Sequence, residues 1–488
     1  RDGTVLRADV WRPEGAGPWP VLLCRTPYDK AASLNARVAE ALAERGYLAV
    51  AQDIRGTHAS DGEVVWQFQR EAYEVECADG ADAVHWAAAL PGSDGRVGSF
   101  GVSYNSWLAL CMAAHRPAPL KALAISGIPG SIHDLNFGIF ETGRRLQWTF
   151  SQASALRARA GDPGWPQTLE EGNVDWLEVQ RGKWLWHLPL DSIPEHVFGP
   201  LDGKLKTYMR EQAVEMWPMR RVAEGLSVPM LLQTGWWDRL SFAVRNYEWA
   251  MEAGAPETRD RHRLLIGPWP HTPFGMEAQI GPVDYGPDAL GFYPGILADW
   301  YDHHFKGRET RLACGDPVQL FILNENRWRG FSSWPPPGVK ETAFHLSSGG
   351  AANTPAGDGR LSLAPPGAEE PPDRYAYDPV DPVMSLMGAD SQMLPVDQRR
   401  NERRRDILVY QTPPLERDLL LVGPARVELW AASDRPDTDF VARLIEVRAD
   451  GLPINISSAI LRARFREGYD REVMLEPGRP TLFTLELL

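Results

Sequence analysis

The sequence predicts an α/β protein, in which a parallel sheet is interrupted by a helical insertion and followed by an all-β region. Three observations indicate this fold class. Short apolar runs alternate with helical patterns over the first 130 residues, the strand signal fades between about residues 128 and 225 and then returns, and short period-two runs follow Gly315. Alternating strands and helices are typical of a doubly wound parallel sheet, and closely spaced short strands are typical of a β-sandwich.

The parallel sheet is expected to begin with four buried strands, because short apolar runs bounded by turn residues fit strands that are covered on both faces. The four runs are 21–24, 47–51, 97–100 and 122–125. Helices are predicted over 33–45 and over about 105–115. The second helix stops before Pro117, since proline lacks the N–H that a helix interior requires.

The insertion is expected to be a helical cap, because it carries helical stretches broken by prolines. It is rich in tryptophan, whose large rings fill cores and also line pockets for bulky ligands: Trp148, Trp165, Trp176, Trp184, Trp186 and Trp217. Apolar runs at 228–232 and 263–266 then complete the sheet, and each run ends in a turn that contains glycine.

Beyond Gly315 the apolar runs become short, and Pro, Gly and Asp separate them. Strands are predicted at 318–322, 407–410, 425–430 and 442–447, and a long surface loop at 347–373. This spacing favours a β-sandwich. We therefore expect an α/β domain formed by residues 1–127 and 226–314, a helical cap formed by 128–225, and a β domain formed by 315–488.

The composition argues against several classes of protein. The 51 Lys and Arg residues against 65 Asp and Glu residues give a formal charge of −14, so nucleic acid is not an expected partner. No apolar run approaches the ~18 residues of a membrane helix, so no membrane partner is expected either. The four cysteines form no C-x-x-C pair, and His303–His304 has no third ligand nearby, so we expect no metal ion and no other cofactor.

The compartment and the assembly are the least determined properties. The chain opens at Arg1 without the apolar stretch of a signal peptide, which favours a cytoplasmic protein. The alternative is that a signal peptide has been removed. A homo-oligomer is compatible with the sequence.

Residues 98–106 combine an apolar strand, a turn of small residues and the start of a helix. This is the context of a nucleophile elbow, in which Ser103 occupies a strained backbone position with its hydroxyl above the sheet. The pattern departs from G-x-S-x-G, because Asn105 stands where the second glycine is expected. The alternative is an ordinary strand, turn and helix with a serine at the helix N-cap.

A serine nucleophile needs a base and a residue that orients the base, and two later strands can supply them. Asp238 ends the segment T-G-W-W-D after one strand, and His271 ends G-P-W-P-H after the next. Each residue alone is a weak indication, since an aspartate after a strand often starts a turn and a lone histidine is more often structural. The order Ser, Asp, His on three strand ends is a much stronger indication.

The three residues have complementary acid–base roles. His271 would accept the Ser103 proton and later deliver it to the leaving group, while Asp238 would orient the imidazole and stabilise its protonated form. An oxyanion hole needs two donors. The Tyr104 backbone N–H at the helix start can be one, and the Tyr28 hydroxyl past the first strand can be the other; a tyrosine after proline is otherwise a packed loop residue.

Several motifs resemble those of one protein family. They are R-x-P-Y-D-K around Tyr28, Q-D-x-R-G-x-x-A-S-D-G-E over 52–63, G-R-V-G-x-F-G-V-S-Y ending at Tyr104, G-W-W-D at Asp238, G-P-W-P-H at His271, Y-A-Y-D-P-V-D-P-V from Tyr375 and D-T-D-F from Asp437. With them, nearly the whole chain resembles the cocaine-esterase-like (CocE/NonD) serine hydrolases, which are related to X-prolyl dipeptidyl-peptidases and α-amino-acid ester hydrolases.

The resemblance implies an α/β-hydrolase core, a helical cap inserted before the strand of Asp238, and a C-terminal jelly roll. It also implies that Ser103, Asp238 and His271 form a catalytic triad, with the Tyr28 hydroxyl and the Tyr104 N–H as oxyanion hole. The family's jelly roll is expected to run several dozen residues past Leu488.

The sequence departs from the family at two places. Ser106 stands where relatives usually have glycine, three residues after the nucleophile. Leu240 and Ser241 stand where α-amino-acid ester hydrolases have acids that bind the substrate ammonium, which argues against a charged α-amino substrate. The cocaine-cleaving branch has an aromatic residue in place of Leu240, so cocaine itself is not the expected substrate.

The expected activity is hydrolysis of a small-molecule ester or amide through an acyl-enzyme. The cap tryptophans favour an apolar or aromatic acyl group, in a pocket predicted to include Trp148, Trp237 and Leu240. Two alternatives stay open. One is X-prolyl dipeptidyl-peptidase or α-amino-acid ester hydrolase activity, and the other is a non-catalytic binding protein on a decayed hydrolase scaffold.

Overall fold

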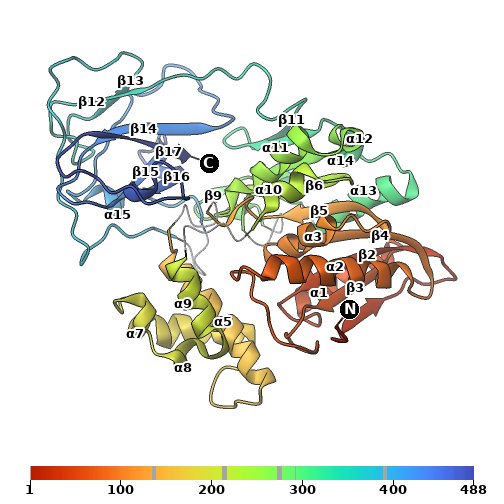
Figure 1. The fold of residues 1–488 in the computed structure, drawn as a ribbon. Helices are drawn as coiled ribbons and strands as arrows, with labels where there is room; N and C mark the ends of the chain where they lie inside the picture. Colours follow the sequence, from red (N-terminus) through yellow and green to blue (C-terminus); the bar gives the residue numbers. More distant parts are fainter. Residues whose placement is uncertain are drawn as a thin grey trace.

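The computed structural model describes residues 2–133, 139–211, 217–271, 277–291, 293–387 and 393–487. Three regions can be followed in Figure 1: a sheet with helices on both faces, a group of helices that includes α5, α7, α8 and α9, and a β region that includes β12 to β17. The chain leaves the sheet for the helical group, returns to complete the sheet, and then enters the β region, as the sequence predicts.

A mixed sheet forms the centre of the first region. Across the described residues its strands run in the order β1-β3-β2-β4-β5-β6-β7-β10-β11. The bounds are β1 Ala8–Trp11, β2 Trp19–Thr26, β3 Leu48–Asp53, β4 Ser93–Val102, β5 Leu120–Ser126, β6 Met230–Trp237, β7 Arg263–Pro270, β10 Val318–Ile322 and β11 Arg327–Phe331. Neighbouring strands from β3 to β10 are parallel, whereas β1 and β11 pair antiparallel at the two edges.

The strand order reverses at β2. The chain passes from β2 outward to β3 and then returns to β4 on the other side of β2. In open α/β sheets such a reversal creates a crevice at the carboxyl ends of the strands, where ligands bind. The segments after β2 and β4, which carry Tyr28 and Ser103, both begin at this switch point.

Helices cover both faces of the sheet because its strands are apolar on both sides. The helices α1 (Ser33–Glu44) and α13 (Tyr293–Lys306) cover one face, and α2 (Ala72–Ala88), α3 (Tyr104–Ala114) and α11 (Val244–Ala253) cover the other. Successive residues of a strand point to opposite faces. Accordingly Leu22 joins the core with α1 and α13, and Leu23 joins the core with α2 and α3.

The helical insertion shares its core with the sheet. Its helices are α5 (Thr142–Arg159), α6 (Leu169–Asp175), α7 (Arg181–Trp184), α8 (Glu195–Phe198), α9 (Asp202–Arg210) and α10 (Met219–Glu224). Trp66 stacks on Trp148 with 5.6 Å between ring centroids, and Phe68 stacks on Trp217 at 5.7 Å. These rings belong to the same buried cluster as the strands under α3, so the cap and the sheet have one continuous core.

The β region consists of antiparallel strand pairs. The pairs are β14 (Ala425–Ala431) with β17 (Thr481–Leu487), β15 (Asp439–Val447) with β16 (Pro453–Arg462), and β12 (His345–Ser347) with β13 (Arg360–Ser362). Phe440, Leu461 and Phe483 contribute to its own small core. Strands predominate in this part of the chain, with the short helix α15 (Arg399–Glu402) among them, while a jelly-roll topology stays a prediction.

Two strands expected in the β domain differ in the structure. Val318–Ile322 forms β10, which lies parallel to β7, so placing it in the sandwich is wrong. A five-residue apolar run fits a buried parallel strand as well as a sandwich strand, and the sequence cannot separate the two. Residues 407–410 form no strand, and the neighbouring Gln411 makes only an isolated bridge to Arg360. The domain boundaries stay a prediction.

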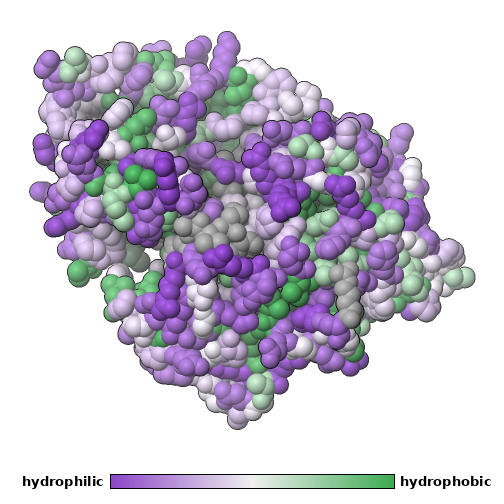
Figure 2. Space-filling model, viewed as in Figure 1, coloured by the Kyte–Doolittle hydropathy of each residue, from purple (hydrophilic) through white to green (hydrophobic). Residues whose placement is uncertain are grey.

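Other short elements of the described chain are α12 (Pro256–Arg259), α14 (Arg311–Cys314), α15 (Arg399–Glu402), β8 (Gln279–Ile280) and β9 (Val283–Asp284). The face shown in Figure 2 is mostly hydrophilic, and its apolar residues are scattered in small patches. Among the residues that the structure describes, no helix combines the length and the hydropathy needed to cross a bilayer.

Candidate active site

Ser103 lies in a strained turn between β4 and α3. Its backbone angles are φ 60° and ψ −123°, a conformation that costs free energy for a residue with a side chain. Gly101 is required two residues earlier, because a Cβ there would lie 2.3 Å from the carbonyl carbon of Asn105. The Ser103 side chain makes no capping hydrogen bond to α3. Ser103 therefore stands at the N-cap position of α3 in a strained turn, and its side chain does not cap the helix.

The two departures from the usual elbow sequence are accommodated by burial and hydrogen bonds. Asn105 is buried, and its Nδ2 donates to Cys24 Sγ at 3.5 Å. The Ser106 hydroxyl lies 2.7 Å from the Gly101 carbonyl and accepts the Ser126 N–H at 2.8 Å. Ser106 therefore joins the elbow to β5, where the usual glycine would leave these groups to other partners.

Asp238 and His271 form a buried pair at the ends of two adjacent strands. His271 Nδ1 lies 2.9 Å from Asp238 Oδ1, and the two residues are 4% and 1% exposed. The same Asp238 oxygen accepts the Leu240 N–H at 2.8 Å. The carboxylate is therefore fixed by the backbone that follows it, and it fixes one ring nitrogen of the imidazole.

Gly127 connects the elbow with this pair. The Ser103 N–H donates to the Ser126 carbonyl at 2.9 Å, so the end of β5 lies against the elbow. The next residue, Gly127, has φ 55°, and a Cβ on it would lie 2.6 Å from Asp238 Oδ2 and 3.1 Å from His271 Cε1. Ser126 and Gly127 thus connect the backbone of Ser103 with the Asp238–His271 pair, and glycine is needed for the close approach of residue 127 to the pair.

Tyr28 and Tyr104 lie beside Ser103 and play different parts. The Tyr28 hydroxyl accepts the Trp148 indole N–H at 3.3 Å. Burial raises the pKa of Tyr28, and hydrogen bonds from Trp148 and Ser103 oppose this shift, so the hydroxyl keeps its proton at neutral pH. Tyr104 begins α3, so its N–H has no intrahelical acceptor, while its hydroxyl is occupied by the Gln67 N–H at 3.0 Å.

Two of the motifs hold the Tyr28 segment in place. Asp53, in the motif over 52–63, accepts the Lys30 N–H at 2.7 Å and the Ala59 N–H at 3.1 Å. His58 Nε2 lies 3.0 Å from the Pro27 carbonyl. The segment after β3 therefore braces the segment after β2, which explains why both motifs occur together.

The three residues predicted for a substrate pocket have different surroundings. Trp148 contacts Tyr28 and lies close to the elbow. Trp237 is buried with Phe321 and Ile454, and its indole N–H donates to Tyr285 at 3.1 Å, so its place in the pocket stays a prediction. Leu240 is buried in the shared core, and its contact with the site is the backbone N–H bonded to Asp238.

Arginines near the predicted catalytic residues are the part of the site that was not predicted from the sequence. Arg239 follows Asp238 directly, and Arg144 and Arg145 lie in the first turn of α5. Burial lowers the pKa of His271 below its ordinary value of 6.5, Asp238 opposes this effect, and Arg239 and Arg144 reinforce it. The sequence does show R-R shortly before Trp148 and an arginine directly after Asp238, but it does not show that Arg145 and Arg239 are buried.

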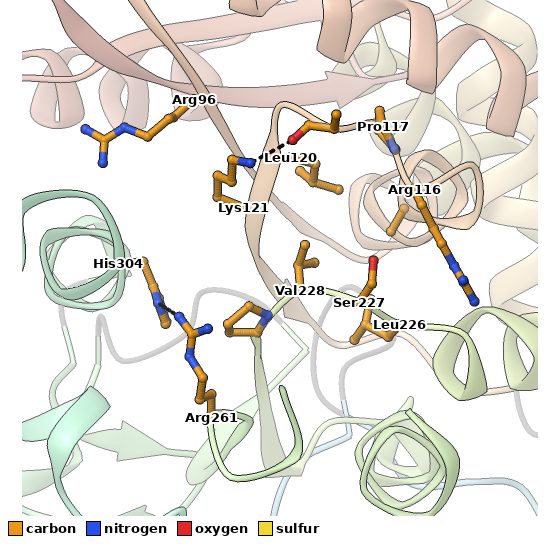
Figure 3. A pocket seen from close by; sticks show the side chains of 13 residues that line it. Arg96, Arg116, Pro117, Leu120, Lys121, Leu226, Ser227, Val228, Arg261 and His304 are labelled. Carbon is orange, nitrogen blue, oxygen red and sulfur yellow. Dashed lines mark hydrogen bonds between the residues drawn. The ribbon is translucent and has the colours of Figure 1, made fainter. Parts of the chain in front are cut away.

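A cavity of about 410 Å³ lies at the opposite ends of the central strands (Figure 3). Arg96, Arg116, Lys121 and Arg261 line it together with His304. These residues precede or begin β4, β5, β6 and β7 or lie on neighbouring helices, so the cavity is at the amino ends of the strands. It contains none of the predicted catalytic residues, which all follow carboxyl ends.

A doubly wound sheet with a strained serine after one strand, and an Asp–His pair after two later strands, defines the α/β-hydrolase class. Residues 2–273 match the family model of the X-Pro dipeptidyl-peptidase (S15 family), and residues 313–488 match that of the X-Pro dipeptidyl-peptidase C-terminal non-catalytic domain. The chain belongs to the S15 family, which confirms the resemblance seen in its motifs.

Individual relatives cover the whole chain. The cocaine esterase of Rhodococcus sp. (strain MB1 Bresler) is 31% identical, and the match spans 100% of this chain and 86% of that protein. A solved α-amino acid ester hydrolase has a TM-score of 0.75 at 24% identity, over 100% of this chain and 84% of that one. An aminopeptidase from a marine sediment archaeon, Thaumarchaeota archaeon, also has a TM-score of 0.75, at 21% identity over the same shares. These two structures support the fold.

Proposed function

We propose that this protein is a serine hydrolase that cleaves a small-molecule carboxylic ester through an acyl-enzyme. Ser103 is the nucleophile, His271 the general base, and Asp238 the residue that orients the base. The observation that carries the proposal is the Asp238–His271 hydrogen bond, packed against Gly127 next to the strained Ser103. The cocaine esterase relationship supports an ester substrate.

The first half-reaction forms the acyl-enzyme. His271 Nε2 accepts the Ser103 proton while Oγ attacks the carbonyl carbon, and the carbonyl oxygen takes the electron pair. The Tyr104 N–H and the Tyr28 O–H donate to this oxygen. When the carbonyl re-forms, the bond to the leaving group breaks, and the leaving group takes the proton from His271.

The second half-reaction regenerates the enzyme. A water molecule attacks the acyl carbon as His271 takes its proton, and the bond to Ser103 Oγ then breaks as that proton returns to the serine. Asp238 stays ionised throughout and stabilises the imidazolium formed in each half. Trp148 beside Tyr28 supports an apolar or aromatic group next to the reacting carbonyl.

Tyr28→Phe tests the hydroxyl donor of the oxyanion hole. Loss of one such donor is expected to lower kcat by about 10²-fold to 10³-fold, because the developing negative charge loses a preorganised hydrogen bond. The measurement is steady-state hydrolysis of p-nitrophenyl acetate, with thermal melting to show that the fold is kept.

Tyr104→Phe is the matched control for that substitution. It removes a hydroxyl that bonds to the Gln67 N–H and leaves the backbone N–H of residue 104 in place. It is expected to lower stability by about 1–2 kcal/mol with little change in kcat. Equal losses of kcat in the two variants would contradict the assignment of the Tyr28 hydroxyl.

The pH dependence of hydrolysis tests His271 as the base. Only the neutral imidazole accepts a proton, so kcat/KM should fall as the pH drops through the pKa of His271. Because this pKa is lowered, the midpoint of the fall should lie below pH 6.5. An acid limb with its midpoint above pH 6.5 in the wild-type protein would contradict the assignment.

A further inference from the structure

Three arginines from two parts of the fold meet beside the catalytic residues. Glu141, the N-cap residue of α5, lies 3.4 Å from Arg145 Nη2 and 3.8 Å from Arg239 Nη1. Arg144 lies in the same first turn of α5. The end of β6, which carries Arg239, and the first cap helix therefore come together at a single carboxylate.

The position of this arginine group relative to the reacting atoms follows from α5. Trp148, whose indole contacts Tyr28, comes four residues after Arg144, and residues at this spacing share one face of a helix. Burial raises the pKa of Tyr28, and the charges of Arg144 and Arg145 oppose that rise. Burial lowers the pKa of His271, and the charges of Arg239 and Arg144 add to that effect. The guanidinium groups are thus electrostatic neighbours of both catalytic side chains.

Some nitrogens of two of these guanidinium groups have no hydrogen-bond acceptor among the residues that the structure describes. Arg239 is only 8% exposed, and neither its Nε nor its Nη1 has an acceptor among the residues that the structure describes. The Arg144 Nε is also buried without an acceptor in that part of the chain. Burial, and then the charges of Arg239 and Arg145, lower the pKa of Arg144 to about 9. A buried cation costs free energy unless a partner compensates it, and here one Glu141 carboxylate faces two arginines.

We propose that Arg144 and Arg239 bind a carboxylate carried by the ester substrate. A guanidinium presents parallel N–H donors that fit the two oxygens of a carboxylate, so this ligand would accept hydrogen bonds from nitrogens that have no acceptor among the described residues, and it would offset the positive charge. The inference rests on the serine hydrolase function proposed above and names its substrate class: an ester with an anionic group near the scissile bond.

The same surroundings disfavour a substrate with a positive charge. An ammonium group beside His271 would face Arg144 and Arg239, and the nearby Glu141 is already shared with Arg145 and Arg239. Leu240, next to Arg239, is a buried apolar residue. The X-prolyl dipeptidyl-peptidase and α-amino-acid ester hydrolase alternatives both require such an ammonium, so the arginines separate this protein from them.

The experiment compares pairs of esters that differ only in charge. The first pair is mono-p-nitrophenyl glutarate and its methyl ester, which place the carboxylate on the acyl side. The second pair is 4-acetoxybenzoate and its methyl ester, which place it on the leaving group. We expect the anionic member of at least one pair to have a kcat/KM at least tenfold higher, mainly through a lower KM.

The variants are Arg144→Gln and Arg239→Gln, with Arg239→Lys as the conservative replacement. Each Gln variant should remove the preference for the anionic ester while hydrolysis of its methyl ester continues, and Lys should restore part of the preference. Arg210→Gln is the matched control, because Arg210 is exposed at the end of α9 and pairs with Asp191 at 3.0 Å. Calorimetric binding of both esters to Ser103→Ala measures the same preference without turnover.

The outcomes separate the inference from the proposed function. Ester hydrolysis that depends on Ser103 but shows no anionic preference in either pair would overturn the carboxylate site and leave the serine hydrolase standing. Turnover that persists in Ser103→Ala would overturn the proposed function itself. A preference that survives in both Gln variants, with their melting temperatures unchanged, would also overturn the carboxylate site.

Discussion

Ser103→Ala is expected to lower kcat for p-nitrophenyl acetate by about 10⁶-fold, because no other group can form the acyl-enzyme. The side chain makes no capping hydrogen bond to α3, and alanine relieves none of the backbone strain at φ 60°. The melting temperature should therefore stay close to that of the wild type. Steady-state hydrolysis and a thermal melt are sufficient to test this.

Covalent labelling gives the control for this variant. A fluorophosphonate probe should label the wild type and fail to label Ser103→Ala. Ser99→Ala removes another serine of β4, whose hydroxyl donates to the Leu23 carbonyl at 2.9 Å, and it should keep the label. A wild-type protein that does not react would instead favour the non-catalytic binding protein.

Asp238→Asn is expected to lower kcat by about 10³-fold to 10⁴-fold. The asparagine oxygen can still accept from both His271 and the Leu240 N–H, since one oxygen receives both in the wild type. What it cannot supply is the negative charge that stabilises the imidazolium. The loss should therefore appear in kcat, with a small change in KM.

A buried acid on the other face of the sheet provides the comparison. Asp302 is 4% exposed and accepts from Tyr47 at 2.5 Å and from Arg308 at 2.8 Å. Asp302→Asn should lower the melting temperature and leave kcat nearly unchanged. If Asp238→Asn kept kcat within tenfold of the wild type, Asp238 would not be the orienting residue.

Much of the central sheet could be predicted from the sequence, because strands buried on both faces are continuous apolar runs. The positions of β2 to β7 follow from such runs, and the turn residues after them indicate the elbow and the Asp–His pair. The order of Ser103, Asp238 and His271 along the sequence indicated a shared site, because functional groups of open α/β sheets gather at the carboxyl ends of the strands. The pairing of β10 with β7 could not be predicted, because the apolar run 318–322 does not indicate which strand it pairs with.

The parts of the site that the sequence did not reveal are those set by tertiary packing. Trp237 is close to Asp238 in sequence, yet it packs with Tyr285 in a separate cluster. An arginine in a helix is usually exposed to solvent, and only the folded structure shows that the charge of Arg144 lies close to that of Arg239. The Ser106 hydroxyl, which joins the elbow to β5, could not be expected from a pattern that asks for glycine.

The stacking of Trp66 on Trp148 and of Phe68 on Trp217 has a consequence for protein engineering. Each pair combines one ring from the segment before α2 with one ring from the insertion, so the insertion is not an interchangeable module. A chimera that receives the insertion of another family member would have to import the facing residues around positions 66 and 68 as well. Transfer of substrate specificity between family members should therefore succeed only when the insertion and the segment around positions 66 and 68 are exchanged together.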